Sequence, residues 1–161
     1  MKIGAILILS SCAKDGEVGP QGPAGNANIH TTTFSVAPGD WEQVGSQGQL
    51  GFGYSVEQTV STITDAIAST GAVLVYRQVG TDGWLALPNM ITEGLGVNRN
   101  WLSVYGPQSV NIGTFTDNQQ TPAITQTQVF KVVAIASSGM IPADVDLNNY
   151  EQVSRFYHLD E

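Results

Sequence analysis

The sequence is short of cysteine, histidine and basic residues. Its 161 residues include one cysteine, two histidines and six Lys or Arg residues, against fourteen Asp or Glu residues. A single cysteine excludes an internal disulfide framework. Nucleic-acid binding needs clustered basic side chains, whereas the bases here are scattered along a chain with a formal net charge of −8. Nucleic acid is therefore excluded as a partner.

Motifs of catalysis and cofactor binding are also missing. Neither His30 nor His158 lies in a nucleophile-elbow context, and no paired His or Cys ligands indicate zinc. No glycine-rich phosphate loop ending in Lys and Ser or Thr is present. Both histidines are expected at exposed edges. The sequence thus predicts no cofactor, no metal and no enzymatic activity.

One acidic segment imitates a calcium loop. Asp144, Asp146 and Asn148 place oxygen ligands at alternate positions. However, Asn149 stands where the loop needs glycine, and Arg155 where it needs a bidentate glutamate. Capping of a following helix is the preferred interpretation of this segment.

Long apolar runs are absent as well. The apolar stretch at residues 3–9 is far shorter than the roughly 20 residues that span a bilayer. Together with Lys2 it forms a short secretory leader, and Leu9-Ser10-Ser11-Cys12 resembles the lipobox of bacterial lipoproteins. That resemblance implies a signal peptide at 1–11, lipidation of Cys12 and anchoring in a membrane. The alternative is that residues 1–12 form a first core strand with a buried cysteine.

Four Gly-led triplets occupy residues 16–27 and resemble collagen-like repeats. Twelve residues in this extended conformation span roughly 37 Å. Only Pro20 and Pro23 support it, so a semi-rigid stalk is favoured over a short triple helix, and the domain is expected to be monomeric. Residues 12–27 would then hold the domain off the membrane. The residue after the cysteine is Ala13 and not the aspartate that favours retention in the inner membrane. We therefore expect the protein at the outer membrane of the cell envelope, on either face.

Strand patterns begin after residue 28 and continue through one domain at 28–161. Residues 50–57 alternate apolar and small or polar side chains, as in a half-buried antiparallel strand. Gly51 and Gly53 on its outer face indicate a bulge or the close approach of another segment. Seven strands are expected, at 30–36, 50–57, 72–76, 84–87, 101–105, 110–115 and 128–136. Their spacing predicts an all-β fold, an antiparallel β-sandwich.

Two helices are expected beside the strands. The first, at 62–69, would begin at Thr62, end before Gly71 and cross one end of the sheets. The second follows Asp146 or Asn148 as its N-cap and packs on a face or mouth of the sandwich. Its apolar side is predicted to consist of Tyr150, Val153, Phe156 and Tyr157.

The lipobox, the stalk, the strand and hairpin at 71–88 and the terminal helix at 150–159 together resemble small collagen-like lipoproteins of Bacteroidota. The resemblance implies location and fold but no activity. The anchor, the stalk, the sandwich and the missing catalytic residues together favour a non-catalytic structural or interaction domain at the surface, with an envelope protein as partner. The alternative is a glycan-binding module that uses Trp41, Trp84 and Trp101. This alternative requires at least two of these rings to be exposed and coplanar.

Overall fold

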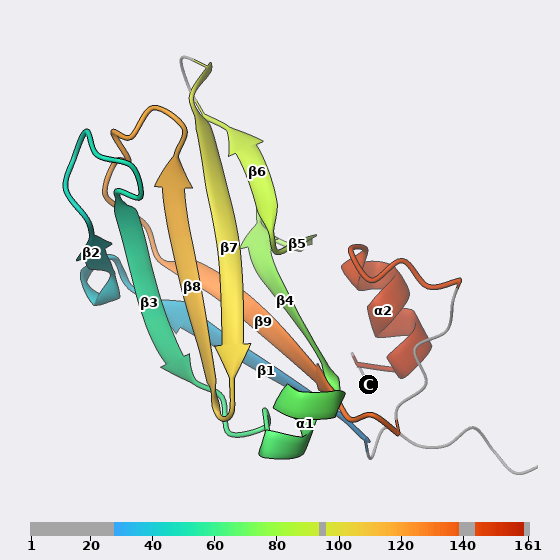
Figure 1. The fold of residues 1–161 in the computed structure, drawn as a ribbon. Helices are drawn as coiled ribbons and strands as arrows, with labels where there is room; N and C mark the ends of the chain where they lie inside the picture. Colours follow the sequence, from blue (N-terminus) through green and yellow to red (C-terminus); the bar gives the residue numbers. More distant parts are fainter. Residues whose placement is uncertain (1–27, 94–95, 139–143, 160–161) are drawn as a thin grey trace, which may run out of the picture.

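The structure, a computed structural model, describes residues 28–93, 96–138 and 144–159. The predicted signal peptide, Cys12 and the stalk lie outside these residues. Within them the chain forms two antiparallel sheets that face each other, one helix at an end and one helix on an outer face (Figure 1). The predicted antiparallel β-sandwich is confirmed.

The four-stranded sheet has the order β1-β9-β4-β5. Its strands are β1 (Ile29–Val36), β9 (Gln128–Ile135), β4 (Ala72–Val79) and β5 (Gly83–Ala86). The five-stranded sheet has the order β2-β3-β8-β7-β6. Its strands are β2 (Glu42–Val44), β3 (Gly53–Thr59), β8 (Ser109–Thr116), β7 (Asn98–Gly106) and β6 (Asn89–Thr92).

The described residues form nine strands, where seven were predicted. The two additional strands, β2 and β6, are the edges of the five-stranded sheet. All three residues of β2 are exposed, and Met90 of β6 is 60% exposed. Such edge strands carry little of the apolar alternation that identifies a strand in a sequence.

The core between the sheets is built from alternate residues of each strand, because successive side chains point to opposite faces. Phe130 on β9 lies opposite Phe34 on β1 and is fully buried. Its ring centroid is 6.2 Å from that of Trp41 and 6.1 Å from that of Trp101. Aromatic rings from both sheets therefore meet at the centre of this inner core.

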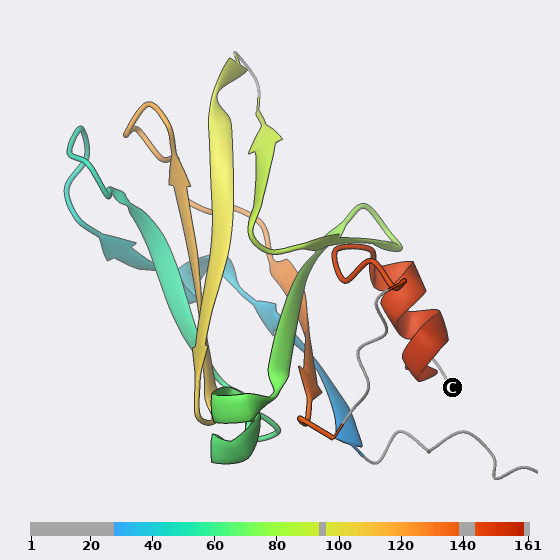
Figure 2. The ribbon, with the colours of Figure 1, turned by 45° about the vertical axis from the view of Figure 1, so that its right-hand side comes forward.

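A second apolar cluster lies on the outer face of the four-stranded sheet. Helix α2 (Tyr150–Tyr157) covers this face, on the side away from the five-stranded sheet (Figure 2). The buried members of the cluster are Tyr76, Val133 and Ile135 of the sheet and Tyr150, Val153 and Tyr157 of the helix. Strands β4 and β9 are apolar on both faces because both faces are covered.

Both helices are confirmed, with other first residues and caps. Helix α1 (Asp65–Thr70) contacts β4 and β7 and so crosses one end of the sandwich. Its N-cap is Thr64, whose hydroxyl accepts a hydrogen bond from the Ile67 N–H, and not Thr62. The helix ends at its C-cap Gly71 as predicted, and a glycine is needed there because a Cβ would lie 2.3 Å from the Ile135 carbonyl oxygen.

Helix α2 is capped by Asn149, whose side chain accepts a hydrogen bond from the Gln152 N–H. The predicted caps Asp146 and Asn148 were wrong. Its buried face contains Ser154 where Phe156 was predicted, and Phe156 is 42% exposed. Residues at positions i, i+3, i+4 and i+7 share one helix face, and from Tyr150 this series includes residue 154 and excludes residue 156.

The loops correct one further prediction and confirm two others. Leu50 is 91% exposed, since β3 begins only at Gly53. The predicted close approach is confirmed at Gly53, where a Cβ would lie 2.3 Å from the Thr114 carbonyl oxygen. The hairpin predicted within 71–88 is also confirmed, between β4 and β5, and the positive φ of 66° in its turn belongs to Gly80.

Candidate binding site beside the C-terminal helix

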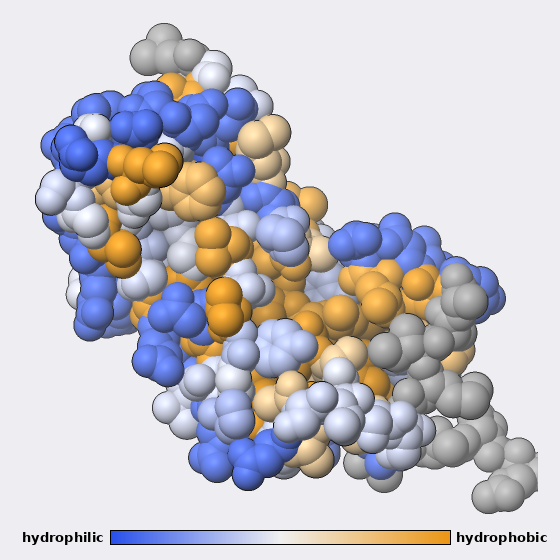
Figure 3. Space-filling model, in the orientation of Figure 1, coloured by the Kyte–Doolittle hydropathy of each residue, from blue (hydrophilic) through white to orange (hydrophobic). Residues whose placement is uncertain are grey.

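A hollow of about 750 Å³ lies where α2 meets the β4–β5 hairpin. In Figure 3 the region around α2 is polar on its outer side and apolar where it approaches the body of the sandwich. The hollow is lined by Asp82, Gly83, Trp84, Leu85, Lys131, Asp146, Asn148, Asn149, Tyr150, Glu151, Ser154 and Arg155. We call it the α2 hollow.

The side chain of Lys131 is the central cation of the α2 hollow. It extends from the outer face of β9, and its Nζ lies 4.3 Å from the centroid of the Trp84 ring and 3.9 Å from that of Tyr150. Lys131 also donates a hydrogen bond to the Tyr150 hydroxyl. Cation–π contacts of this kind hold an ammonium group against aromatic faces. Three elements, β5, β9 and α2, are thereby joined at one point.

Tyr76 on β4 holds the segment that leads into α2 against the sheet. Its hydroxyl donates a 2.8 Å hydrogen bond to the Leu147 carbonyl, and its ring lies 5.1 Å from that of Tyr150 at 69°. Burial raises the pKa of Tyr76, and the charges of Tyr150 and Asp146 act in the same direction. The hydroxyl therefore stays protonated and remains a donor to the backbone at neutral pH.

The rim of the hollow is polar and exposed. Asp146 Oδ1 accepts hydrogen bonds from the backbone and the side-chain nitrogen of Asn148, which forms a turn before the helix. Glu151 and Arg155 form an exposed pair at 3.4 Å. Such a rim offers carboxylate and amide groups to hydroxyl or amino groups of a ligand. Among the described residues, no group of three His, Cys, Asp or Glu side chains could hold a metal ion.

The three tryptophans do not share one surface. Trp41 and Trp101 are 8% and 2% exposed, and their rings meet at 73° with centroids 5.8 Å apart. Both belong to the inner core, so they do not supply the exposed and coplanar pair that the glycan-binding alternative requires. The physical reason is that their large apolar rings fill the space between the sheets. Trp84 alone among the three lines the α2 hollow.

Lys131 and Tyr150 were not among the sequence candidates for binding. A signal for Lys131 exists, since it is the one charge in the otherwise apolar run at 129–136. A lysine on a sheet face that a helix covers keeps its amino group near solvent by directing it toward the edge of that helix. The sequence did not reveal which aromatic rings would receive it.

His30 and His158 are exposed, as predicted, and neither lines the α2 hollow. His30 lies on the edge strand β1, and His158 follows α2 in the left-handed conformation. The two described helices, of six and eight residues, are too short to cross a bilayer.

No protein-family model, no curated protein and no solved structure matches this chain.

Proposed function

We propose that this chain is a lipoprotein of the cell envelope whose β-sandwich is a non-catalytic structural or interaction domain. In this proposal Cys12 carries the lipid anchor, residues 16–27 are the stalk and an envelope protein is the partner. The outer membrane is the proposed location. The likeness to collagen-like lipoproteins of Bacteroidota supports the location and carries no activity.

The observation on which this proposal rests is the order of segments along the chain. The lipobox at Cys12 and the Gly-led triplets come directly before β1, which starts at Ile29. Only the stalk would therefore separate the anchor from the first paired strand. Lipid anchoring gains about 0.8 kcal/mol per buried methylene group, so several acyl chains at one cysteine hold a protein of this size.

The α2 hollow is the proposed contact surface for the partner. Its aromatic floor, with Trp84 and Tyr150, can be desolvated by a partner, while the carboxylates and amides of the rim can pair with it. Interfaces commonly combine such an apolar centre with a polar rim. The hollow is lined by three acidic residues, Asp82, Asp146 and Glu151, and by two basic ones, Lys131 and Arg155. The excess of acidic groups favours a partner with basic groups.

The anchor is tested by expressing the chain and its Cys12→Ala variant in a bacterial host that lipidates proteins. We expect the wild type in the detergent phase of a detergent phase separation, with an incorporated fatty-acid label. Cys12→Ala should move to the aqueous phase and lose the label. A variant lacking residues 16–27 serves as the control and should remain anchored. Recovery of Cys12→Ala with the detergent phase would refute the anchor.

The same deletion tests the stalk. If residues 16–27 are only a spacer, their removal should leave the melting temperature and the monomeric mass of the chain unchanged. A trimer that dissociates when these residues are deleted would instead establish a collagen-like triple helix, because such a helix needs three chains.

Glycan binding through Trp84 alone is the second candidate, since the burial of Trp41 and Trp101 removes the version that needs two exposed tryptophans. Trp84 lies beside carboxylate and amide groups in the α2 hollow. Neutral oligosaccharides would stack on the face of the Trp84 ring that Lys131 does not occupy and would hydrogen-bond to the rim. Binding of the full chain to a glycan array is the measurement. Trp84→Ala should abolish any signal, whereas Tyr105→Ala, which removes a 40% exposed ring on the other sheet, should preserve it. An array signal that survives in Trp84→Ala would rule out this site.

A further inference from the structure

Six buried side-chain atoms in the described part of the chain have no hydrogen-bond partner there. They are Trp41 Nε1, Arg77 Nε, Asn89 Oδ1, Arg99 Nη1, Trp101 Nε1 and Thr114 Oγ1. Buried polar atoms in folded proteins are almost always paired. A group of unpaired atoms in one place marks where an enclosed water or a bound ion can supply the missing partner.

Three of these residues form one row across the five-stranded sheet. Asn89 on β6 lies opposite Trp101 on β7, which lies opposite Thr114 on β8. Residues directly opposite one another on neighbouring strands point to the same face of a sheet. Trp101 belongs to the inner core, so Asn89 and Thr114 also face the space between the sheets.

The other three residues surround the same ring. The Arg77 guanidinium carbon, carried by β4 of the opposite sheet, lies 4.7 Å from the centroid of the Trp101 ring. The Trp41 ring lies 5.8 Å from it. Arg99 is two positions before Trp101 on β7 and therefore points to the same face. All six residues thus form one group between the sheets, which we call the Trp101 cluster.

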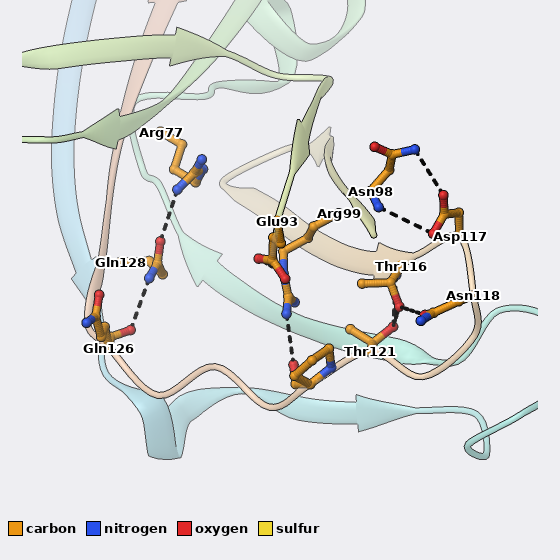
Figure 4. A network of polar contacts seen from close by, with 11 residues as sticks. Arg77, Glu93, Asn98, Arg99, Thr116, Asp117, Asn118, Thr121, Gln126 and Gln128 are labelled. Carbon is orange, nitrogen blue, oxygen red and sulfur yellow. Dashed lines mark hydrogen bonds and ion pairs between the residues drawn. The ribbon is translucent and has the colours of Figure 1, made fainter. Parts of the chain in front are cut away.

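The charges of this cluster are not balanced. Arg77 and Arg99 are 7% and 4% exposed. Arg99 Nε pairs with Glu93 Oε1 at 2.5 Å, and its Nη2 donates to the Pro122 carbonyl at 3.2 Å (Figure 4). Arg77 Nη1 donates to the neutral side chain of Gln128 at 3.3 Å. Of the two buried guanidinium groups, Arg99 therefore pairs with a carboxylate and Arg77 with a neutral amide.

This imbalance has an electrostatic consequence for Arg77. Burial lowers the pKa of its guanidinium, the charge of Arg99 lowers it further, and Glu93 acts in the opposite direction. An uncompensated buried charge is strongly destabilising. Stacking on Trp101 offsets part of this cost, and a negative charge placed near both arginines would offset more.

We propose that the Trp101 cluster binds a small monovalent anion of the size of chloride between the two sheets. Four of the six unpaired atoms are N–H donors, from Trp41, Arg77, Arg99 and Trp101. A halide accepts hydrogen bonds from guanidinium and indole N–H groups alike, and one placed near Arg77 would neutralise the second guanidinium charge. The low exposure of both arginines excludes a bulky ligand. This site is independent of the α2 hollow and of the anchor.

Enclosed water is the competing occupant, because it can also accept hydrogen bonds from buried N–H groups. Water carries no charge, so it leaves the arginine imbalance in place. The two occupants therefore differ in their dependence on the anion in solution. An anion that binds the folded chain raises its melting temperature with concentration, whereas enclosed water does not respond to the choice of salt.

Thermal unfolding of the full chain in sodium chloride and in sodium gluconate, at equal ionic strength, tests this proposal. We expect chloride to raise the melting temperature by a few degrees relative to gluconate. Arg77→Met, which removes the charge and keeps the length, should abolish this difference. Arg155→Met, which removes an exposed arginine on α2, is the matched control and should retain it. An equal chloride effect in wild type and Arg77→Met, or none in the wild type, would overturn the proposal.

Should Arg77→Met not fold, crystals of the wild-type chain soaked in bromide decide the question. We expect an anomalous peak within hydrogen-bond distance of Arg77 Nε. Maps without a peak in the Trp101 cluster would contradict the site.

Discussion

The two sheets of the sandwich share one core and differ in what covers their outer faces. Helix α2 covers the outer face of the four-stranded sheet, where Val133 and Ile135 are buried. The outer face of the five-stranded sheet is not covered by either helix (Figure 1). There Asn111 lies opposite Val104, which is 63% exposed.

This difference explains the two kinds of strand pattern in the sequence. A strand covered on both faces needs apolar residues at successive positions, as in the run Val132-Val133-Ala134-Ile135. A strand covered on one face alternates, as in β8, where Val110 and Ile112 are buried and Asn111 is exposed. Substitutions on the three faces should therefore differ in their cost.

The inner core should be the most sensitive. Phe130→Ala removes a fully buried ring that contacts Phe34, Trp41 and Trp101. We expect the free energy of unfolding to fall by about 3–5 kcal/mol, the usual range for phenylalanine truncation in a core. Urea denaturation measures it. A loss of unfolding free energy no greater than that of Val153→Ala on α2 would contradict the prediction that the inner core is the most sensitive region.

The covered outer face should come second. Val153→Ala truncates a fully buried residue of α2, and we expect a loss of about 2 kcal/mol, from the methyl groups removed and the cavity left. Phe156→Ala, at an exposed position of the same helix, is the matched control and should cost much less. If the two variants were equally stable, α2 would not pack on the sheet as described.

Alkaline pH should act on the same outer cluster through Tyr76. Its raised pKa means that the folded chain holds the phenol proton more tightly than the unfolded chain does. Tyrosines in an unfolded chain have a pKa of about 10. The stability that the Tyr76 proton contributes is therefore complete below that pH and is lost as the pH rises above it. Burial raises the pKa of Tyr157 in the same direction.

The variant Tyr76→Phe measures the Tyr76 contribution. It should lose about 1 kcal/mol at neutral pH, because the Leu147 carbonyl loses its donor. It should also lose stability less steeply than wild type above pH ~10. Urea denaturation at neutral and alkaline pH provides both values. Identical alkaline slopes for the two proteins would contradict the role of Tyr76.

The uncovered outer face should show the smallest effect. Val104→Thr keeps the side-chain shape at an exposed position, and substitutions at such positions usually change stability by less than about 0.5 kcal/mol. Urea denaturation is again the measurement. A loss above 1 kcal/mol, on the order of a buried-site effect, would indicate that this face is covered in solution.

Much of the fold could be predicted from the sequence because local patterns specify it. Alternation identified β3 and β8, the apolar run identified β9, and Gly71 marked the end of α1. The helix caps were displaced by one to three residues, since several Thr, Asp and Asn residues near each helix start could serve equally well. The edge strands β2 and β6 were missed because their pairing is imposed by a neighbouring strand.

The candidate sites were predicted far less well. Of the three tryptophans named as binding candidates, only Trp84 lines the α2 hollow. Trp41 and Trp101 were named on the same ground, as aromatic residues able to stack on sugars, but they fill the inner core. Exposure of a ring depends on which segments cover it, and no local pattern around a tryptophan carries that information.

The sequence by itself determined the class of fold, the two-faced strands and the order of leader-like segment, triplets and domain. These properties follow from residue periodicity and local backbone preference. Only the tertiary structure decided that Lys131 meets Trp84 and Tyr150, and that Arg77 and Trp101, from different sheets, stack on each other. Contacts between residues far apart in the chain arise from sheet order and packing, which alternation along one strand does not encode.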